Sequence, residues 1–267
     1  MLYRKIPPPP RLTPFVRFFW VLECSVSDVP YVHRTMADGC AELIVHYKGR
    51  FEELDAPGTS DGYRSMVHAQ SRTFRRFRTK EDFGIFGAYL YPFTVSFLTR
   101  TPSVDTSDHL IDLSSLFGSD GRELEERLML AETTALRVGL LAGFLDRKLS
   151  AISPMEERIF SSIRHVVHSH GSDNVGRLAE RFNMSTRQLE RTFKDHAGFS
   201  PKLFSRIARF QSAIREGYGP IRSLTDLALN CGYYDQSHFI HEFKAFSGHH
   251  PRAFFIDNGE GRLIAEA

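Results

Sequence analysis

Four charged residues of one short stretch have the types and the spacing to bind nucleic acid. Arg187, Glu190, Arg191 and Lys194 follow one another at intervals of three, one and three, so a helix would present all four on one side. Guanidinium groups can hydrogen-bond guanine, a carboxylate can accept from cytosine, and an ammonium group can pair with phosphate. A solvated helix surface carries the same residue types, so the surrounding elements have to decide between the two interpretations.

An amphipathic helix over about 185–196 would position these side chains. Leu189 and Phe193 lie one turn apart, away from the charged side, and would be buried. Ser185 or Thr186 would supply the oxygen that caps the first turn. The stretch therefore predicts a helix with one buried face and one charged face.

A shorter helix is predicted just before it, over residues 175–182. Leu178, Ala179 and Phe182 recur there at helical spacing, and the small Ala179 would let the two helices cross closely. Two short helices, a tight turn and a polar outer face on the second helix are typical of a helix-turn-helix unit.

The same unit recurs about 50 residues later. Leu178-Ala179 returns as Leu227-Ala228, at a spacing of 49 residues. After one inserted residue in the turn the spacing becomes 50, and Leu189, Phe193, Lys194, Gly198 and Pro201 return as Phe239, Phe243, Lys244, Gly248 and Pro251. A repeat in which each copy closes on Gly-x-x-Pro is hard to produce by chance, and it predicts a second reading helix over about 235–246.

The second copy resembles the signature of a known family. It reads Ala228-Leu-Asn-Cys-Gly-Tyr-Tyr-Asp-Gln-Ser-His-Phe-Ile-His-Glu-Phe-Lys-Ala-Phe-Ser-Gly-His-His-Pro251. This is similar to the signature of AraC/XylS-type transcription regulators, and the resemblance covers roughly residues 155–255. It implies a bacterial, sequence-specific regulator of transcription whose two reading helices enter successive major grooves of double-stranded DNA.

The resemblance also assigns residues that would contact DNA. In the first copy Arg187, Glu190 and Arg191 match the family's base-facing positions, and Gln188 is adjacent to them. In the second copy Gln236, Ser237, His238 and His241 match the reading positions. Lys194 and its repeat Lys244 are expected to contact phosphate or to be solvated charges. Ser237 could equally bind a phosphate, and a solvated helix surface is the alternative for each of them. His241 stands where the family commonly has arginine, so we expect a weaker grip on a base there.

Further helices complete a predicted all-α domain over residues 154–255. Ser153 and Pro154 suit the N-cap and first position of a helix over 156–170. Ser200 and Pro201 repeat this pattern and open a long helix over 202–216 that would join the two units. The residues expected on its buried face are Leu203, Ile207, Phe210 and Ile214.

The N-terminal half shows the shorter period of strands. Aromatic and β-branched runs predict strands over 15–22, 42–47 and 83–91, with a turn at 38–39 and a loop over 50–63. Consecutive prolines predict an extended lead over 1–12 without helix. The fold class is therefore α+β: an N-terminal antiparallel sheet or barrel with following helices, then the all-α domain.

Two helices are predicted after the strands, over 119–128 and 133–149. Leu124 and Leu128 would be buried in the first. The broad apolar face of the second would consist of Leu136, Leu140, Leu141, Phe144 and Leu145. This second helix could mediate dimerisation, or it could cap the sheet and link the domains.

Residues 14–150 resemble, less specifically, the N-terminal domain of some AraC-like regulators. The matching stretches are Leu12-Thr-Pro-Phe-Val, Trp20-Val-Leu-Glu, Asp38-Gly-Cys-Ala-Glu-Leu and Leu110-x-Asp-Leu. That domain looks like a cupin-type sensory module, so the resemblance implies a sensor role and leaves the ligand-binding residues unknown.

The composition limits which classes of protein the chain could belong to. No apolar run of about 18 residues and no signal-peptide pattern occurs, so we expect neither a membrane partner nor export. Three unpatterned cysteines fit a reducing cytoplasm. Residues 154–255 hold 14 Lys and Arg against 10 Asp and Glu, whereas residues 1–153 hold 19 of each. This excess agrees with DNA binding without establishing it.

No motif for a catalytic centre, cofactor or metal is present. His33, His46, His68 and Cys40 lack the close spacing of metal ligands and are better explained as satisfied or exposed residues. Cys24 and Cys40 could be redox sensors, but small buried hydrophobes are the preferred interpretation.

We therefore predict a cytoplasmic DNA-binding regulator with a sensory or oligomerisation domain at 1–150, a DNA-binding domain at 154–255 and a tail at 256–267. Its expected partners are double-stranded DNA, a small-molecule effector, a second copy of the chain and, for an activator, RNA polymerase. Two alternatives stay open: a cupin-type enzyme or metal-binding protein with an added DNA-binding domain, and a ligand-independent architectural protein.

Overall fold

The computed structural model describes residues 1–25, 30–55, 64–149, 152–219 and 223–257. The chain divides into two compact units. The first, here called the β unit, consists of Met1–Arg34, Cys40–Gln70 and Arg75–Ile152. The second, the helical unit, contains Thr35–Gly39, Ser71–Phe74 and the chain from Ser153 onward.

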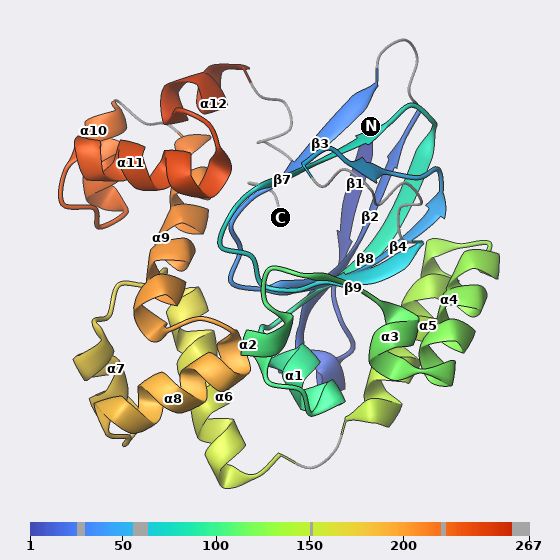
Figure 1. Cartoon of the computed structure of the whole chain (residues 1–267), viewed down its shortest axis with the longest axis horizontal. Helices are drawn as coiled ribbons and strands as arrows, with labels where there is room; N and C mark the ends of the chain where they lie inside the picture. Colours follow the sequence, from blue (N-terminus) through green and yellow to red (C-terminus); the bar gives the residue numbers. More distant parts are fainter. Residues whose placement is uncertain (26–29, 56–63, 150–151, 220–222, 258–267) are drawn as a thin grey trace. The chain divides into compact units, whose positions relative to one another are not determined.

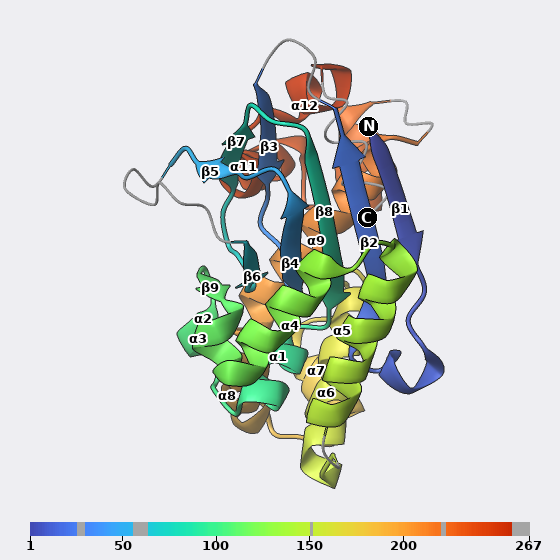
Figure 2. The same cartoon turned by 90° about the vertical axis from the view of Figure 1, so that its right-hand side faces the viewer.

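Two antiparallel sheets form the framework of the β unit (Figure 2). The larger has the order β1 (Leu2–Ile6), β2 (Val16–Cys24), β8 (Phe83–Leu90), β4 (Ala41–Lys48), β6 (Ser65–His68) and β9 (Leu110–Asp112). The smaller has the order β3 (Tyr31–Thr35), β7 (Arg75–Thr79) and β5 (Glu52–Glu53). With the helices below, this confirms the predicted α+β class.

Helices follow β8 in the chain, with β9 between the second and the third of them. They are α1 (Phe93–Thr99), α2 (Ser103–Thr106), α3 (Leu113–Phe117), α4 (Ser119–Leu130) and α5 (Thr134–Lys148). Figure 2 shows α4 and α5 crossing one face of the larger sheet. β8 lies in the middle of that sheet and is buried along its whole length, which explains its continuous apolar sequence.

The predicted apolar face of α5 is wrong at its start. Leu136 is 55% exposed, whereas the neighbouring Arg137 is 7% exposed. Arg137 Nε donates to the Leu128 carbonyl at 3.2 Å, and its guanidinium lies 3.7 Å from the centre of the Tyr47 ring. An arginine can be buried when its donors and its flat face both find partners, which helical spacing alone does not reveal.

The extended lead predicted over 1–12 is a paired strand at its start and a 3-10 turn at its end. Residues 2–6 pair with β2, from Leu2 opposite Glu23 to Ile6 opposite Phe19. The prolines do not exclude helix either, because Pro10–Leu12 forms a short 3-10 turn, η1, in which proline occupies the first position. The predicted loop over 50–63 contains the short strand β5, and its remainder lies partly outside the described residues.

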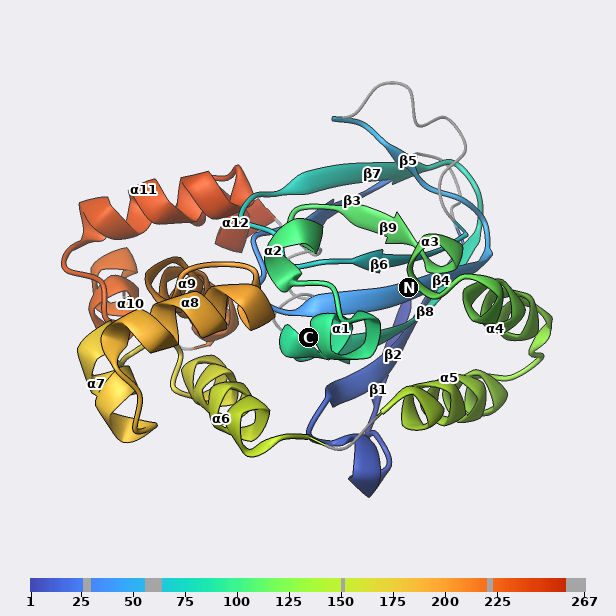
Figure 3. The same ribbon diagram turned by 60° about the horizontal axis from the view of Figure 1, so that its bottom comes forward.

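The helical unit is built of helices, and the two longest have 15 and 17 residues. The helices are α6 (Pro154–His168), α7 (Val175–Arg181), α8 (Thr186–Ala197), α9 (Pro201–Gly217), α10 (Leu224–Asn230), α11 (Gln236–Ser247) and α12 (Pro251–Asp257). Figures 1 and 3 both show α9 between the pair α7–α8 and the pair α10–α11. Ser153 is the N-cap of α6 and Pro154 its first residue, as the Ser-Pro pattern predicts. Glu156 completes a capping box that was not predicted, and the helix ends at His168 instead of residue 170.

Aromatic rings join α9 to both pairs. Phe204 packs edge-on against Phe193 of α8 at 5.3 Å between ring centres, and Phe210 packs against Phe243 of α11 at 5.2 Å. Leu203 was predicted to be in this core but is only half-buried, and Phe204 is buried in its place. The larger ring takes the central position because it removes more apolar surface from water.

Within the described residues, no helix is both long and apolar enough to cross a membrane.

Candidate nucleic-acid interface

The two helix pairs begin and end their reading helices in the same way. Ser185 Oγ accepts from the Gln188 amide at 3.2 Å at the start of α8, and Asp235 Oδ1 accepts from the His238 amide at 2.7 Å at the start of α11. Gly198 and Gly248 end the two helices in the left-handed conformation, which glycine adopts without a steric penalty.

The turns between the helices also correspond, residue by residue, up to one point. Asn183 and Gly232 have positive φ angles of 52° and 75°. The next residues are both buried, and their amides donate back to the first helix, Met184 to Ala179 at 3.0 Å and Tyr233 to Ala228 at 2.9 Å. In the first turn the cap residue, Ser185, comes directly after Met184. In the second turn Tyr234 lies between Tyr233 and the cap residue, Asp235, so Tyr234 is the inserted residue.

In the first pair, α8 exposes most of the residues predicted to touch DNA. Arg187, Glu190, Arg191 and Lys194 are exposed. Gln188 is half-buried and its amide lies 3.8 Å from the Met155 sulfur. The predicted core residues of this pair are all at most 2% exposed: Leu178, Ala179, Leu189 and Phe193.

In the second pair, α11 exposes Gln236, Ser237, His241 and Lys244. Gln236 Oε1 accepts from the Thr225 hydroxyl of α10 at 2.8 Å. Phe239 and Phe243, predicted as core, are fully buried. The exposed side chains of both reading helices are thus available to a partner, and contact with DNA itself stays a prediction.

His238 differs from the other predicted contact residues. It is half-buried, its Nε2 lies 3.3 Å from Glu242 Oε1, and its ring meets that of Tyr233 edge-on at 5.4 Å. An imidazole in this place is oriented by the protein, so it has less freedom than its exposed neighbours to turn toward a base.

The buried carboxylate of Glu242 was not predicted from the sequence. Glu242 is 3% exposed, and Arg206 of α9 donates to its Oε1 at 2.5 Å. Burial, with the Glu242 charge as the second cause, raises the pKa of the neighbouring Tyr233 hydroxyl well above its usual value. Glu242 lies three residues after Phe239 and four before Phe246, and this core spacing is the one signal that could have indicated its burial.

The two pairs carry opposite charge. Residues 175–197 hold five Lys and Arg against three Asp and Glu. Residues 224–247 hold one basic residue, Lys244, against three acidic residues: Asp226, Asp235 and Glu242. The first pair is therefore suited to phosphate contact through charge, and the second has to rely mainly on neutral groups.

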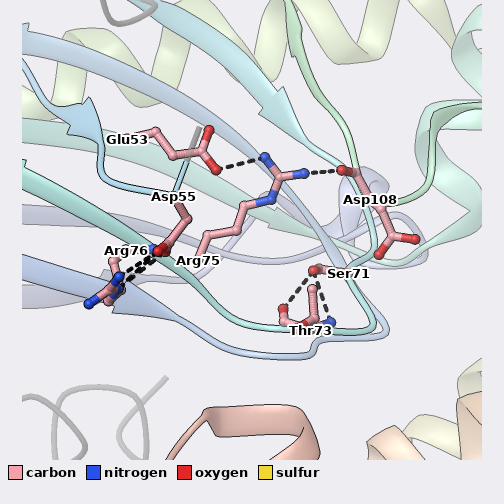
Figure 4. Close-up of polar contacts among 7 residues, drawn as sticks. All are labelled: Glu53, Asp55, Ser71, Thr73, Arg75, Arg76 and Asp108. Carbon is pink, nitrogen blue, oxygen red and sulfur yellow. Dashed lines mark hydrogen bonds and ion pairs between the residues drawn. The ribbon is translucent and has the colours of Figure 1, made fainter. Parts of the chain in front are cut away.

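A separate polar cluster lies in the β unit (Figure 4). Arg75 donates to the Glu53 carboxylate at 3.0 Å and to the Asp108 carbonyl, and Arg76 pairs with Asp55 at 2.5 Å. His68 is 7% exposed, and its Nε2 has no hydrogen-bond partner among the described residues. Burial and the charge of Arg75 lower the pKa of His68 to about 4, so this side chain is neutral at pH 7.

The cysteines and candidate metal ligands differ in how far they are buried. Cys40 is buried as predicted, whereas Cys24 is only half-buried. His46 is buried and His33 is half-buried. Burial and the neighbouring His46 lower the pKa of His33 to about 4. No group of three or more His, Cys, Asp or Glu in the described part of the chain could hold a metal ion.

Comparison with known proteins identifies the helix pairs. The family described as "Helix-turn-helix domain" matches residues 178–255, and the family described as "Domain of unknown function (DUF6597)" matches residues 4–112. The transcriptional activator RhaS of Pectobacterium carotovorum is 39% identical over 75 residues, which are 28% of this chain and 27% of RhaS. Residues 178–255 form an AraC/XylS-type helix-turn-helix domain. The predicted resemblance is thereby confirmed for this part of the chain.

Two further likenesses cover more of the chain. The XylDLEGF operon transcriptional activator of Pseudomonas putida is 29% identical over 116 residues, 42% of this chain and 36% of that protein. A solved structure of ToxT from Vibrio cholerae superposes with a TM-score of 0.48 at 10% identity, over 99% of this chain and 100% of ToxT. The matches to RhaS and to the XylDLEGF activator thus span about a quarter and a third of those proteins' length.

Proposed function

We propose that this chain is a sequence-specific, DNA-binding regulator of transcription that inserts α8 and α11 into successive major grooves. The observation that carries the proposal is the doubled unit: two helix pairs with matching caps, matching turns and matching buried residues, both packed on α9. A helix with a polar outer face fits the major groove, where each base pair presents a distinct pattern of donors and acceptors. Two such helices on one chain perform what two subunits perform in simpler repressors.

The exposed residues of α8 would read bases and phosphates. Arg187 and Arg191 can each grip guanine O6 and N7, and Glu190 can accept from the amino group of cytosine. Lys194, one turn further along the helix, is suited to a phosphate. Gln188 is half-buried, so less of its side chain would be available to DNA.

The exposed residues of α11 would read the adjacent groove. Gln236 can bind adenine with its amide, and Ser237 and Lys244 can bind phosphate. His241 would make one hydrogen bond where an arginine would make two. His238 would act chiefly from within the protein, through its contact with Glu242.

The β unit would sense an effector or join two copies of the chain. Buried polar atoms without a hydrogen-bond partner in the described structure, His68 Nε2 and Gln70 Oε1, are consistent with a unit that binds a polar small molecule. In this proposal residues 1–150 are the sensory or oligomerisation domain and residues 154–255 bind DNA. The proposed place of action is the cytoplasm.

The names of the relatives suggest whether the chain activates or represses transcription. RhaS and the XylDLEGF protein are both named transcriptional activators. We infer activation through contact with RNA polymerase for this chain as well.

The proposed sequence-specific binding can be tested by selecting bound sites from a random DNA pool with the full chain at a fixed salt concentration. The expected result is an enriched motif with two half-sites about 10–10.5 base pairs apart. The control is the double variant Arg187→Ala with Arg191→Ala, whose exposed side chains can be removed without disturbing the core and which should lose the first half-site only. Binding without any enriched motif, abolished steeply by salt, would contradict sequence-specific reading.

A further inference from the structure

Tyr234 is the residue by which the second turn exceeds the first, and its side chain points into solvent. It is 88% exposed, whereas the adjacent Tyr233 is 3% exposed. Two neighbouring tyrosines thus have opposite positions: one belongs to the core of the second helix pair, and the other stands outside it. The core does not account for an aromatic side chain at position 234.

The backbone on both sides of Tyr234 is held in place. Before it, the Tyr233 amide donates to Ala228 at 2.9 Å, and the Tyr233 ring packs against Phe239 at 5.1 Å. After it, Asp235 caps α11 through the His238 amide at 2.7 Å. The phenol of Tyr234 is therefore presented from a fixed point, two residues before Gln236, at the end of α11 that would enter the groove.

The charge of this helix pair points to what the phenol would bind. With one lysine against three acids over residues 224–247, the second pair has few cations with which to approach a DNA backbone. Tyrosine hydroxyls are among the neutral donors that bind phosphate oxygens in protein–DNA complexes. A hydroxyl can make this contact without a positive charge, and its ring can lie along the sugar.

We propose that the Tyr234 hydroxyl donates a hydrogen bond to a DNA phosphate at the edge of the groove that α11 enters. This inference rests on the proposed function, since it assigns a further contact within the same DNA complex. The inserted residue would then supply to the second pair a backbone contact like the one that Lys194 would supply to the first.

The test compares Tyr234→Phe with wild type on the selected site and on random DNA, at several salt concentrations. Tyr234→Phe removes only the hydroxyl from an exposed side chain, so its melting temperature should equal that of wild type. The expected result is a Kd about five- to tenfold weaker on both DNAs, which corresponds to the loss of about one hydrogen bond. The slope of log Kd against log salt should stay unchanged, because a neutral donor releases no counterion.

Leu229→Ala is the matched control, because Leu229 is a 56% exposed apolar residue of the same helix pair, in α10. It should bind like wild type. An unchanged Kd for Tyr234→Phe would overturn the inference, and so would a changed salt slope, which would indicate a rearranged interface. Failure of the wild-type chain to select any site would instead contradict the proposed function, and this would be seen before any variant is made.

Discussion

The two helix-turn-helix units share a framework and differ in surface. Both have a capped reading helix, a positive-φ turn residue and a fully buried phenylalanine against α9. The first exposes two arginines and a lysine on its reading helix, whereas the second exposes one lysine together with glutamine, serine and histidine. The same fold can therefore be kept by a few apolar and capping positions while the residues that would meet DNA change freely.

The difference extends to how each reading helix is held. α8 is joined to α9 by apolar contact, with Phe193 on Phe204. α11 has the equivalent aromatic contact and, in addition, the pair of Arg206 with the buried Glu242. A buried, paired carboxylate is weak evidence for added stability. Among the described contacts, α11 is thus joined to α9 by an ion pair as well as by aromatic packing, and it is the less basic of the two helices.

The largest expected effect tests the shared framework. Phe193→Ala and Phe243→Ala should each destabilise the helical unit by about 3–5 kcal/mol, because both rings are fully buried against α9. Chemical unfolding followed by circular dichroism would measure this. Leu136→Ala, at a 55% exposed position, is the control and should change little. A large loss for one phenylalanine and a small loss for the other would break the equivalence of the two units.

The next effect tests the difference in reading. Arg187→Ala should cost about 1–3 kcal/mol of specific affinity and relax the preference at one base position of the first half-site. His241→Ala should cost less, because an imidazole makes fewer hydrogen bonds to a base than a guanidinium does. Site selection with each variant would show which half-site changes. Equal losses on selected and random DNA would contradict base reading by Arg187.

Much of the helical unit could be predicted because its signals are local. Ser153-Pro154 and Ser200-Pro201 each open a helix, and the apolar repeat marks the buried face of each reading helix. Glu242 could not be predicted in the same way, since its partner Arg206 lies 36 residues away on another helix. Local spacing places a residue on a face, but it does not identify a distant partner.

The β unit was harder to predict for a related reason. β6 consists of four residues and is held by pairing with β4 and β9, from distant parts of the chain. Short strands of this kind take their conformation from their neighbours more than from their own sequence. The lead at 2–6 became β1 because β2 was available to pair with it. All of the predicted DNA-contact residues except Gln188 and His238 are exposed, and their contact with DNA stays a prediction.

A smaller effect concerns the turns. Gly232→Ala should destabilise the helical unit by about 1–2 kcal/mol, because φ at this position is 75° and an alanine is strained there. Asn183→Gly, at the corresponding position with φ of 52°, should be neutral or slightly stabilising. Thermal unfolding of the two variants would measure both. A harmless Gly232→Ala would show that the second turn does not need its left-handed residue.

The smallest expected effect tests whether the equivalent lysines of α8 and α11 both bind phosphate. Lys194→Gln and Lys244→Gln each remove one cation from equivalent positions of α8 and α11. If both lysines bind phosphate, each variant should lower the slope of log Kd against log salt by about 0.9, with little change in the selected motif. The first unit keeps Arg187 and Arg191 on its reading helix, whereas the second keeps no Lys or Arg over residues 224–247 once Lys244 is replaced. We therefore expect the Lys244 variant to lose more affinity at low salt. A slope that falls for Lys194→Gln alone would mean that α11 approaches DNA only through neutral groups, as Tyr234, Gln236 and Ser237 could provide.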